Sequence, residues 1–146
     1  MRTGRVLASG LFGAALALGI TAAPATAADG WQKTVDVSES SYSNGESKRC
    51  ATSGNGQACF QAYGEWFWLR DSYVNGEPIA MDWYVETSAG VRSGVAYWNG
   101  GSAAGWTNLN KSFDEGYTIT FRVCEVDIPT EWVYEDTCSS WTSTTT

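Results

Sequence analysis

The stretch from residue 59 to residue 85 constrains the fold of this chain more than any other part of its sequence. Two aromatic-rich runs lie on either side of Asn75-Gly76, and every second residue within each run is apolar. The apolar positions are Phe67, Leu69, Ile79, Met81, Trp83 and Val85. A period of two predicts β-strands, and Asn-Gly between two such strands predicts a tight hairpin. We therefore expect the core to be built on a hairpin at Asn75-Gly76.

The remainder of the chain after residue 28 continues this pattern. Its clearest strand covers residues 117–126, where Tyr117, Ile119 and Phe121 alternate with polar side chains. Six to eight short runs of this kind are separated by Gly, Asn and Ser, and no segment keeps apolar residues at helical spacing for three turns. This arrangement predicts an all-β fold, either an antiparallel β-sandwich or a small barrel, with two disulfides.

Residues 1–28 have the parts of a secretory signal peptide. Arg2 and Arg5 precede an apolar stretch over residues 6–20, and small residues at 23–27 supply a cleavage site. No stop-transfer pattern follows, so we expect export of the mature chain to the extracellular space rather than a membrane anchor.

Three further regions are predicted in the mature chain: an N-terminal arm at 29–48, a β-sandwich domain at 49–141 and a disordered tail at 142–146. The arm carries three apolar residues, Trp31, Val35 and Val37, before a Ser-rich linker at 38–47. Such a segment suits insertion into a partner protein. The alternative is that it forms an edge strand of the domain's own sheet.

Four cysteines follow the signal peptide. An even number in a small exported chain indicates two disulfides, and the short spacings favour Cys50–Cys59 and Cys124–Cys138. Metal binding is not expected, since the chain contains no His and no CxxC motif.

The net charge excludes two classes of partner. Lys and Arg number 9 and Asp and Glu number 16, and loss of Arg2 and Arg5 with the signal peptide leaves 7 − 16 = −9. Such a chain is repelled by nucleic acid and by an anionic membrane surface, so neither is expected to be a partner.

The sequence offers little for catalysis. Without His there is no Ser-His-Asp or Cys-His site, and bridged cysteines leave no free thiolate. Glu65 and Asp82 are expected on adjoining strands, where two carboxyl groups about 5–10 Å apart would suit a glycosidase. The small domain indicates no pocket around them, so we predict a protein that is not an enzyme and that uses no cofactor.

The aromatic residues carry the strongest functional signal, because all 8 Trp and 7 Tyr follow the signal peptide. If Phe67 and Leu69 point into the core, Trp66 and Trp68 point outward, and Tyr84 does so from the next strand. An exposed ladder of Trp66, Trp68 and Tyr84 would bind sugar rings or a protein partner. The alternative places Trp66 and Trp68 between two packed sheets.

The run from residue 58 to residue 83, with CF, Gly64-Glu65, WLRD and NG, resembles small secreted actinobacterial proteins with two disulfides. The segment EGYTITFRVCEVD is similar to the same group. Some of these proteins look like the small adaptor subunit of umbrella-shaped antibacterial toxin particles, which joins a lectin-like subunit to the large toxin chain. A second resemblance is to tendamistat-type amylase inhibitors, but their Trp-Arg-Tyr triplet is missing here. The nearest sequence is Trp68-Leu69-Arg70-Asp71.

Three functions are therefore open: a secreted protein-binding adaptor, a carbohydrate or cell-wall binding module, and an enzyme inhibitor. The adaptor is the first prediction, with another secreted protein as partner and Trp31, Val35, Val37, Trp66, Trp68 and Tyr84 as candidate contacts. A sugar binder should present coplanar Trp rings on one face, and an inhibitor should present a rigid loop with a side chain such as Arg70.

Overall fold

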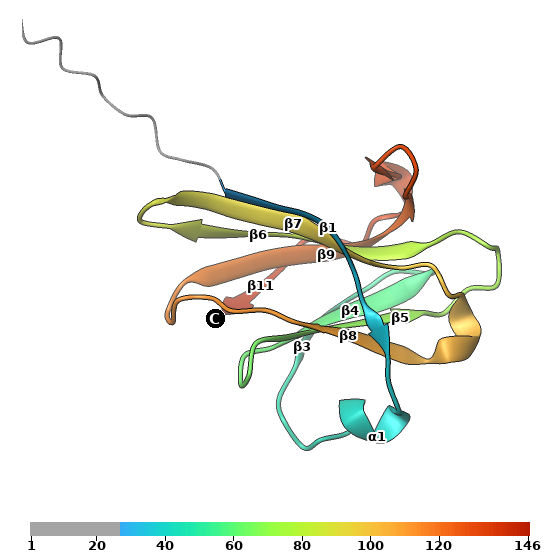
Figure 1. The fold of residues 1–146 in the computed structure, drawn as a ribbon, viewed down its shortest axis with the longest axis horizontal. Coiled ribbons are helices and arrows are strands. Elements are labelled where there is room, and N and C mark those ends of the chain that lie inside the picture. The colour runs from blue at the N-terminus through green and yellow to red at the C-terminus, as the bar shows by residue number, and fades with distance from the viewer. Residues whose placement is uncertain (1–26) are drawn as a thin grey trace, which may run out of the picture.

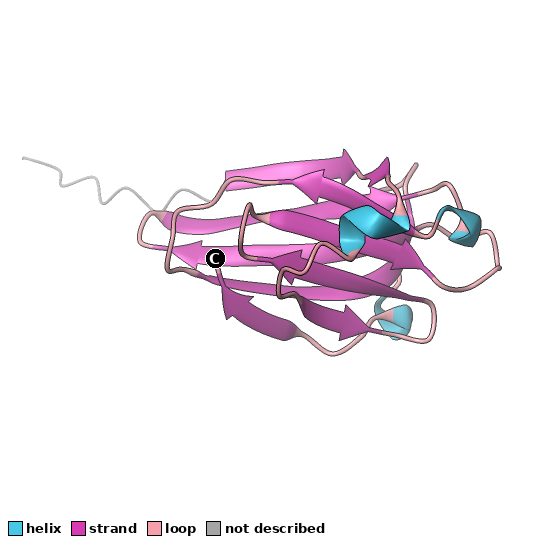
Figure 2. Ribbon diagram, turned by 90° about the horizontal axis from the view of Figure 1, so that it is seen from below, coloured by secondary structure: helices cyan, strands magenta, loops and turns pink. Residues whose placement is uncertain are grey.

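A computed structural model describes residues 27–146 as two β-sheets packed face to face (Figure 1). The view in Figure 2 shows strands throughout, with only short helices at the periphery. The all-β sandwich predicted from the alternation of apolar residues is therefore confirmed. The predicted signal peptide falls almost entirely on residues 1–26, which lie outside the described part of the chain.

The first sheet has six strands, and β9 lies near its centre. Strands β1, β7, β6 and β9 follow in that order, and β10 and β11 pair with different parts of β9. All pairs are antiparallel except β1 with β7, which is parallel. The six strands are β1 (Ala27–Lys33), β6 (Ile79–Thr87), β7 (Gly90–Trp98), β9 (Thr118–Asp127), β10 (Trp132–Val133) and β11 (Thr142–Thr145).

The second sheet has five antiparallel strands in the order β2, β8, β5, β4, β3. They are β2 (Val35–Asp36), β8 (Trp106–Asn110), β5 (Trp66–Asp71), β4 (Gly56–Gln61) and β3 (Arg49–Thr52). The helices are α1 (Glu39–Tyr42) and two 3-10 turns, η1 (Ser102–Ala104) and η2 (Glu135–Thr137). No helix within residues 27–146 has the length and apolar character needed to cross a membrane.

The core lies between the two sheets and consists of the residues that the alternation selected. Phe67 of β5 meets Trp83 of β6 with ring centroids 5.4 Å apart. The fully buried side chains of this core include Phe60, Phe67, Leu69, Ile79, Met81, Trp83, Val85, Ile119, Phe121 and Val123. The strands β4, β5, β6 and β9 thus each turn one face to the core, as a period of two requires.

The predicted hairpin at Asn75-Gly76 is wrong, because β5 and β6 belong to different sheets. Asn75 lies in a crossover between the sheets, where its side-chain oxygen accepts a hydrogen bond from the Glu77 amide at 3.1 Å. Its side-chain nitrogen donates to Glu125 at 2.5 Å. A local Asx turn of this kind reverses the chain without pairing the flanking strands.

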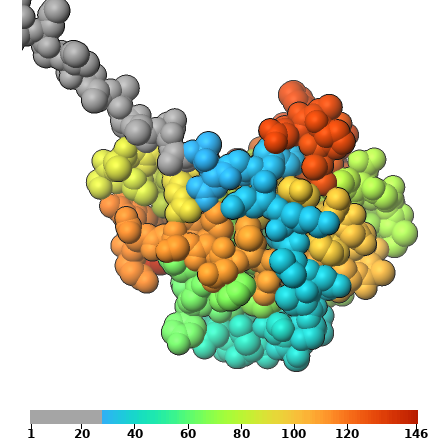
Figure 3. All heavy atoms as spheres, in the orientation of Figure 1, coloured from blue at the N-terminus to red at the C-terminus, as the bar shows by residue number. Residues whose placement is uncertain are grey.

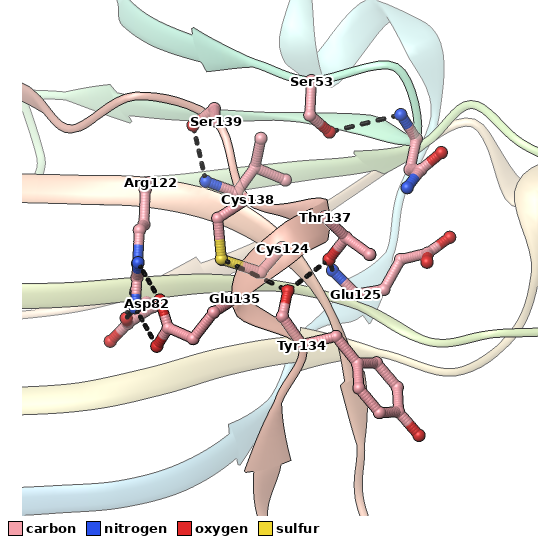
Figure 4. Close-up of a disulfide and its surroundings, with 12 residues drawn as sticks. Ser53, Asp82, Arg122, Cys124, Glu125, Tyr134, Glu135, Thr137, Cys138 and Ser139 are labelled. Carbon is pink, nitrogen blue, oxygen red and sulfur yellow. Dashed lines mark hydrogen bonds and ion pairs between the residues drawn. A yellow bond between two sulfur atoms is a disulfide. The ribbon is translucent and has the colours of Figure 1, made fainter.

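Both predicted disulfides are confirmed. Cys50 and Cys59 lie directly opposite each other on β3 and β4, and Cys124 of β9 is bonded to Cys138 just after η2 (Figure 4). The two bridges fit a protein that folds in an oxidising environment.

The first part of the predicted arm at 29–48, residues 29–36, pairs with both sheets, which corrects the prediction of a separate arm and matches the edge-strand alternative. β1 pairs with β7 from residue 27 to residue 33, and β2 then pairs with β8 in the other sheet. Between them Thr34 is buried and donates from its backbone nitrogen to the Tyr97 carbonyl at 2.9 Å. The segment therefore crosses from one sheet to the other along one side of the sandwich (Figure 1).

The predicted disordered tail at 142–146 is also an ordered part of the first sheet. β11 pairs with β9 over residues 142–145, and Thr146 is buried with its amide bonded to the Tyr117 carbonyl at 2.8 Å. Threonine suits this position because β-branched side chains favour strands, a preference that the polar composition concealed.

Candidate functional site

The predicted site residues are divided between opposite faces of the sandwich. Trp31 and Tyr84 lie on the outer face of the six-stranded sheet. Trp66 and Trp68 lie on the outer face of the five-stranded sheet, where Val37 also packs. The predicted ladder of Trp66, Trp68 and Tyr84 is therefore wrong, because the crossover after β5 takes β6 into the other sheet.

The two Val residues contribute little to an open surface. Val35 is 62% exposed but lies in the two-residue edge strand β2. Val37 is partly buried against the Trp cluster of the five-stranded sheet. Neither of them joins Trp31 in a common apolar stripe, so the predicted contact segment of the arm is not formed.

Trp68 is only 2% exposed, although it points away from the core between the sheets. The ring of Tyr42 from α1 covers it at 5.5 Å in an edge-to-face arrangement and stacks on Trp106 at 3.7 Å. Trp68 is thus neither on an open ladder nor between the sheets. It belongs to a second, smaller core under residues 37–48, and this arrangement matches neither prediction.

One row of residues crosses the outer face of the six-stranded sheet. Trp31 of β1 is the register partner of Val95 in β7, Val95 is the partner of Asp82 in β6, and Asp82 is the partner of Arg122 in β9. Side chains directly opposite each other on neighbouring strands have Cβ atoms about 5 Å apart. The row therefore places an aromatic side chain, an apolar one and an ion pair in one line across the sheet.

Arg122 is the centre of this face (Figure 4). Its Nε donates to the Asp82 carboxylate at 2.9 Å, and its two terminal nitrogens donate to the Glu135 carboxylate at 2.6 and 2.8 Å. The Arg122 side chain is 13% exposed and that of Glu135 is 68% exposed. The planar guanidinium is thus held on two sides by carboxylates, in the bidentate geometry that fixes its orientation.

The pKa values of these groups follow from their surroundings. Hydrogen bonds to Glu135, together with those to Asp82, raise the pKa of Arg122. The hydrogen bonds that Glu135 accepts from Arg122 lower the pKa of Glu135. Burial raises the pKa of Asp82, because the loss of water outweighs the hydrogen bond from Arg122. The Glu135 carboxylate therefore faces solvent, whereas the Asp82 carboxylate lies beneath the Arg122 guanidinium.

Two aromatic pairs flank the charged centre. The Arg122 guanidinium lies 4.3 Å from the centroid of the Trp141 ring, and Tyr84 meets Trp141 edge to face at 5.5 Å. On the other side Trp31 and Tyr97 have ring centroids 6.2 Å apart. Trp141 is 45% exposed, so this pair leaves aromatic surface open to solvent.

A projecting segment, residues 128–138, bounds this face at one end. It contains β10 and η2 and stands above the sheet in Figures 1 and 3. Its base is held by the Cys124–Cys138 bridge, and Val133 packs against Ala80 and Val126. Trp132 near its tip is 62% exposed. The outer face of the six-stranded sheet is therefore bordered at one end by a segment that a disulfide anchors to β9.

Three members of this site were not predicted from the sequence: Arg122, Tyr97 and Trp141. The alternation in β9 placed Arg122 on the face opposite Phe121, and that in β7 placed Tyr97 beside Val95, so the signal for both was present. Trp141 had no such signal, because its position depends on the disulfide at Cys138 and on the pairing of β11.

The carboxylate pair considered for hydrolysis is not assembled. Glu65 lies in the turn between β4 and β5, where its carboxylate accepts the Phe113 amide at 2.9 and 3.0 Å. Asp82 faces outward from the other sheet and is paired with Arg122. Within the described residues no group of three or more His, Cys, Asp or Glu side chains could hold a metal ion.

We predict that Glu65→Gln and Asp82→Asn will not alter any hydrolytic activity, because neither carboxylate has a partner placed for acid–base chemistry. The measurement is a screen of the unmodified chain against polysaccharide, peptidoglycan and peptide substrates. Turnover that is lost in either variant would contradict this prediction.

In comparisons with known proteins, no family model, curated protein or solved structure matches the chain. The fold is a small β-sandwich with two disulfides, and the candidate site is a surface of aromatic and charged side chains on its six-stranded sheet.

Proposed function

We propose that this chain is a non-catalytic protein-binding module, an adaptor subunit of an extracellular complex, and that the outer face of its six-stranded sheet is the contact surface. The observation that carries the proposal is the position of Arg122, which is held by two carboxylates and covered by the partly exposed ring of Trp141. Trp, Tyr and Arg dominate the energetics of protein interfaces, and rigid side chains lose little entropy on binding.

The relative orientation of the aromatic rings favours a protein partner over a carbohydrate. The planes of Tyr84 and Trp141 meet at 68°, and those of Trp31 and Tyr97 meet at 47°. A sugar-binding platform needs coplanar exposed rings. Tilted rings around fixed charges instead suit the irregular surface of a protein, in which aromatic, apolar and charged groups alternate.

The inhibitor hypothesis finds less support. Arg70 lies within β5, paired with Gln57 on one side and Trp106 on the other. Its guanidinium is 5.8 Å from the centroid of the Trp106 ring. A side chain in the middle of a paired strand does not reach into the active site of an enzyme as a loop residue does.

Two features of the sequence support the extracellular setting. The predicted signal peptide indicates export, and the resemblance to small actinobacterial proteins with two disulfides includes adaptor subunits of toxin particles. The disulfides fit the same setting. The partner proposed here is accordingly another secreted protein of the same organism.

The test is affinity capture from culture supernatant of the producing organism, with the mature chain immobilised and captured proteins quantified by mass spectrometry. We expect at least one secreted protein to be enriched, and expect the double variant Trp31→Ala/Tyr84→Ala to lose it. Tyr63→Ala is the matched control, since Tyr63 is 76% exposed in the turn between β4 and β5, in the other sheet.

A parallel assay tests the carbohydrate alternative by electrophoresis of the same three proteins through gels containing soluble polysaccharides or cell-wall fragments. Retardation that disappears in Trp31→Ala/Tyr84→Ala, without any captured protein, would contradict the proposal in favour of a carbohydrate-binding module.

A further inference from the structure

Residues 37–48, which we name the strap, lie across the outer face of the five-stranded sheet, opposite the proposed protein-binding surface. Figure 1 shows α1 of this segment beneath β5 and β8, on the side away from the six-stranded sheet. None of the four residues of α1 is buried, and no side chain caps the helix. The side chains at 38–40 and 43–47 are exposed. The strap therefore adds little buried surface of its own.

One strap side chain contributes most of its contact with the sheet. The Tyr42 ring stacks on Trp106 at 3.7 Å with an angle of 6° between the planes, and meets Trp68 edge-on at 5.5 Å. Its hydroxyl lies 3.7 Å from the sulfur of Cys59. The Tyr42 ring thus lies in a slot with the shape of a flat aromatic ring. Three sides of this slot are formed by Trp106, Trp68 and the Cys50–Cys59 bridge.

The slot contains a hydrogen-bond donor that Tyr42 does not use. Among the residues that the structure describes, the indole nitrogen of Trp68 is the one buried side-chain nitrogen or oxygen without a hydrogen-bond partner. By contrast, the indole nitrogen of Trp98 donates to the Gly101 carbonyl at 3.0 Å. A buried donor without a partner costs about 1–3 kcal/mol, so it calls for an explanation.

Few contacts besides those of Tyr42 join the strap to the five-stranded sheet. At its start the Val37 amide donates to the Trp106 carbonyl at 3.3 Å, and just beyond its end Cys50 is bonded to Cys59. Between these points Asn44 donates to Gln61 at 3.0 Å, and the Lys48 ammonium donates to Asn44 within the strap and lies 5.4 Å from the centroid of the Trp68 ring. Segments with few buried contacts open at much lower free energy than the core does.

We propose that the slot between Trp106 and Trp68 is a binding site for an aromatic side chain of another protein, and that Tyr42 occupies it in the free chain. The tyrosyl ring of the strap shows which group fits against Trp106. A backbone carbonyl of the incoming segment supplies the acceptor that the Trp68 indole lacks. This site lies on the opposite sheet from Trp141 and does not depend on the function proposed above.

The test uses the Tyr42→Ala chain, which empties the slot, and Tyr42→Phe as the matched control that keeps it filled. The probe is a labelled synthetic peptide with the sequence of residues 36–48, and a second peptide carries Tyr42→Ala. Fluorescence anisotropy should give binding of the first peptide to Tyr42→Ala at least about tenfold tighter than to Tyr42→Phe or to the unmodified chain. The second peptide should not bind. In nitrogen-15 spectra the Trp68 indole signal should shift on binding.

Equal binding to all three chains, equal binding of the two peptides, or no binding to a folded Tyr42→Ala chain would overturn the proposal. Binding of a soluble oligosaccharide in place of the peptide would overturn it in favour of a sugar site. If Tyr42→Ala does not fold, hydrogen exchange of the unmodified protein decides. The Trp68 indole proton should then exchange about 100-fold faster than the Phe67 and Leu69 amides, and equal rates would contradict a displaceable strap.

Discussion

Trp68→Ala is expected to lower the free energy of unfolding by about 3–5 kcal/mol, because truncation of a buried Trp leaves a large cavity. Trp68 is 2% exposed and contacts both Tyr42 and Trp66, so its loss removes the centre of the second core. Urea titration followed by far-ultraviolet circular dichroism measures the effect.

Trp141→Ala is the matched control for this variant. It removes the same side chain from a position that is 45% exposed, so its cost should be below about 1 kcal/mol. A Trp68→Ala protein as stable as Trp141→Ala would mean that the strap does not cover Trp68 in solution, and the described second core would then be incorrect.

Asp29→Ala is the second substitution with a large expected effect, about 3 kcal/mol or more in the free energy of unfolding. Asp29 of β1 accepts two hydrogen bonds from Arg92, both at 2.8 Å, and is also paired with Lys111. The Lys111 side chain is only 4% exposed, and after the substitution Gln32 would be its remaining partner. A buried ammonium without a carboxylate is costly, and β1 would also lose the side-chain hydrogen bonds that join Asp29 to Arg92 of β7.

The control for Asp29→Ala is the double variant Asp29→Asn/Lys111→Met, which removes the buried charge together with its partner. It should regain most of the lost stability, as replacement of a buried ion pair by groups of similar volume often does. If the double variant is as unstable as Asp29→Ala, packing of β1 rather than the charge on Lys111 accounts for the loss.

The same ion pair predicts how stability depends on pH. The hydrogen bonds from Arg92, assisted by Lys111, lower the pKa of Asp29 from 3.8 to about 2. Because the folded value lies below the unfolded one, the contribution is complete above about pH 4 and disappears as the pH falls towards 2. We expect a loss of about 2 kcal/mol across this interval that is absent in Asp29→Asn. Equal acid sensitivity of the two proteins would contradict the assignment.

The sequence predicted the core and the disulfides because both depend on local patterns. Alternation selects the inward residues of a strand whichever sheet it joins, so Phe67 and Trp83 were placed in the core correctly. The choice of sheet is a non-local property. Asn75-Gly76 looked like a hairpin turn, but pairing with β4, β8, β7 and β9 takes β5 and β6 into separate sheets.

The candidate site was less predictable for the same reason. Tyr84 and Trp31 were predicted as contact residues. The topology that brings them near Arg122, however, includes a parallel pairing of β1 with β7, which are more than sixty residues apart in the sequence. Trp68 was misplaced because the Ser-rich segment that covers it has the composition of a flexible linker. That segment is docked on the sheet by Tyr42, whose ring stacks on Trp106.

The most direct test of the proposed binding surface is the dissociation constant of the captured protein for three chains: unmodified, Trp141→Ala and Tyr63→Ala. Removal of the ring that covers Arg122 should weaken binding by about 30-fold, which corresponds to about 2 kcal/mol and to a typical hot-spot residue. Tyr63→Ala should bind as the unmodified chain does. Unchanged affinity for Trp141→Ala, or an equal loss in Tyr63→Ala, would contradict the assignment of the outer face of the six-stranded sheet as the contact surface.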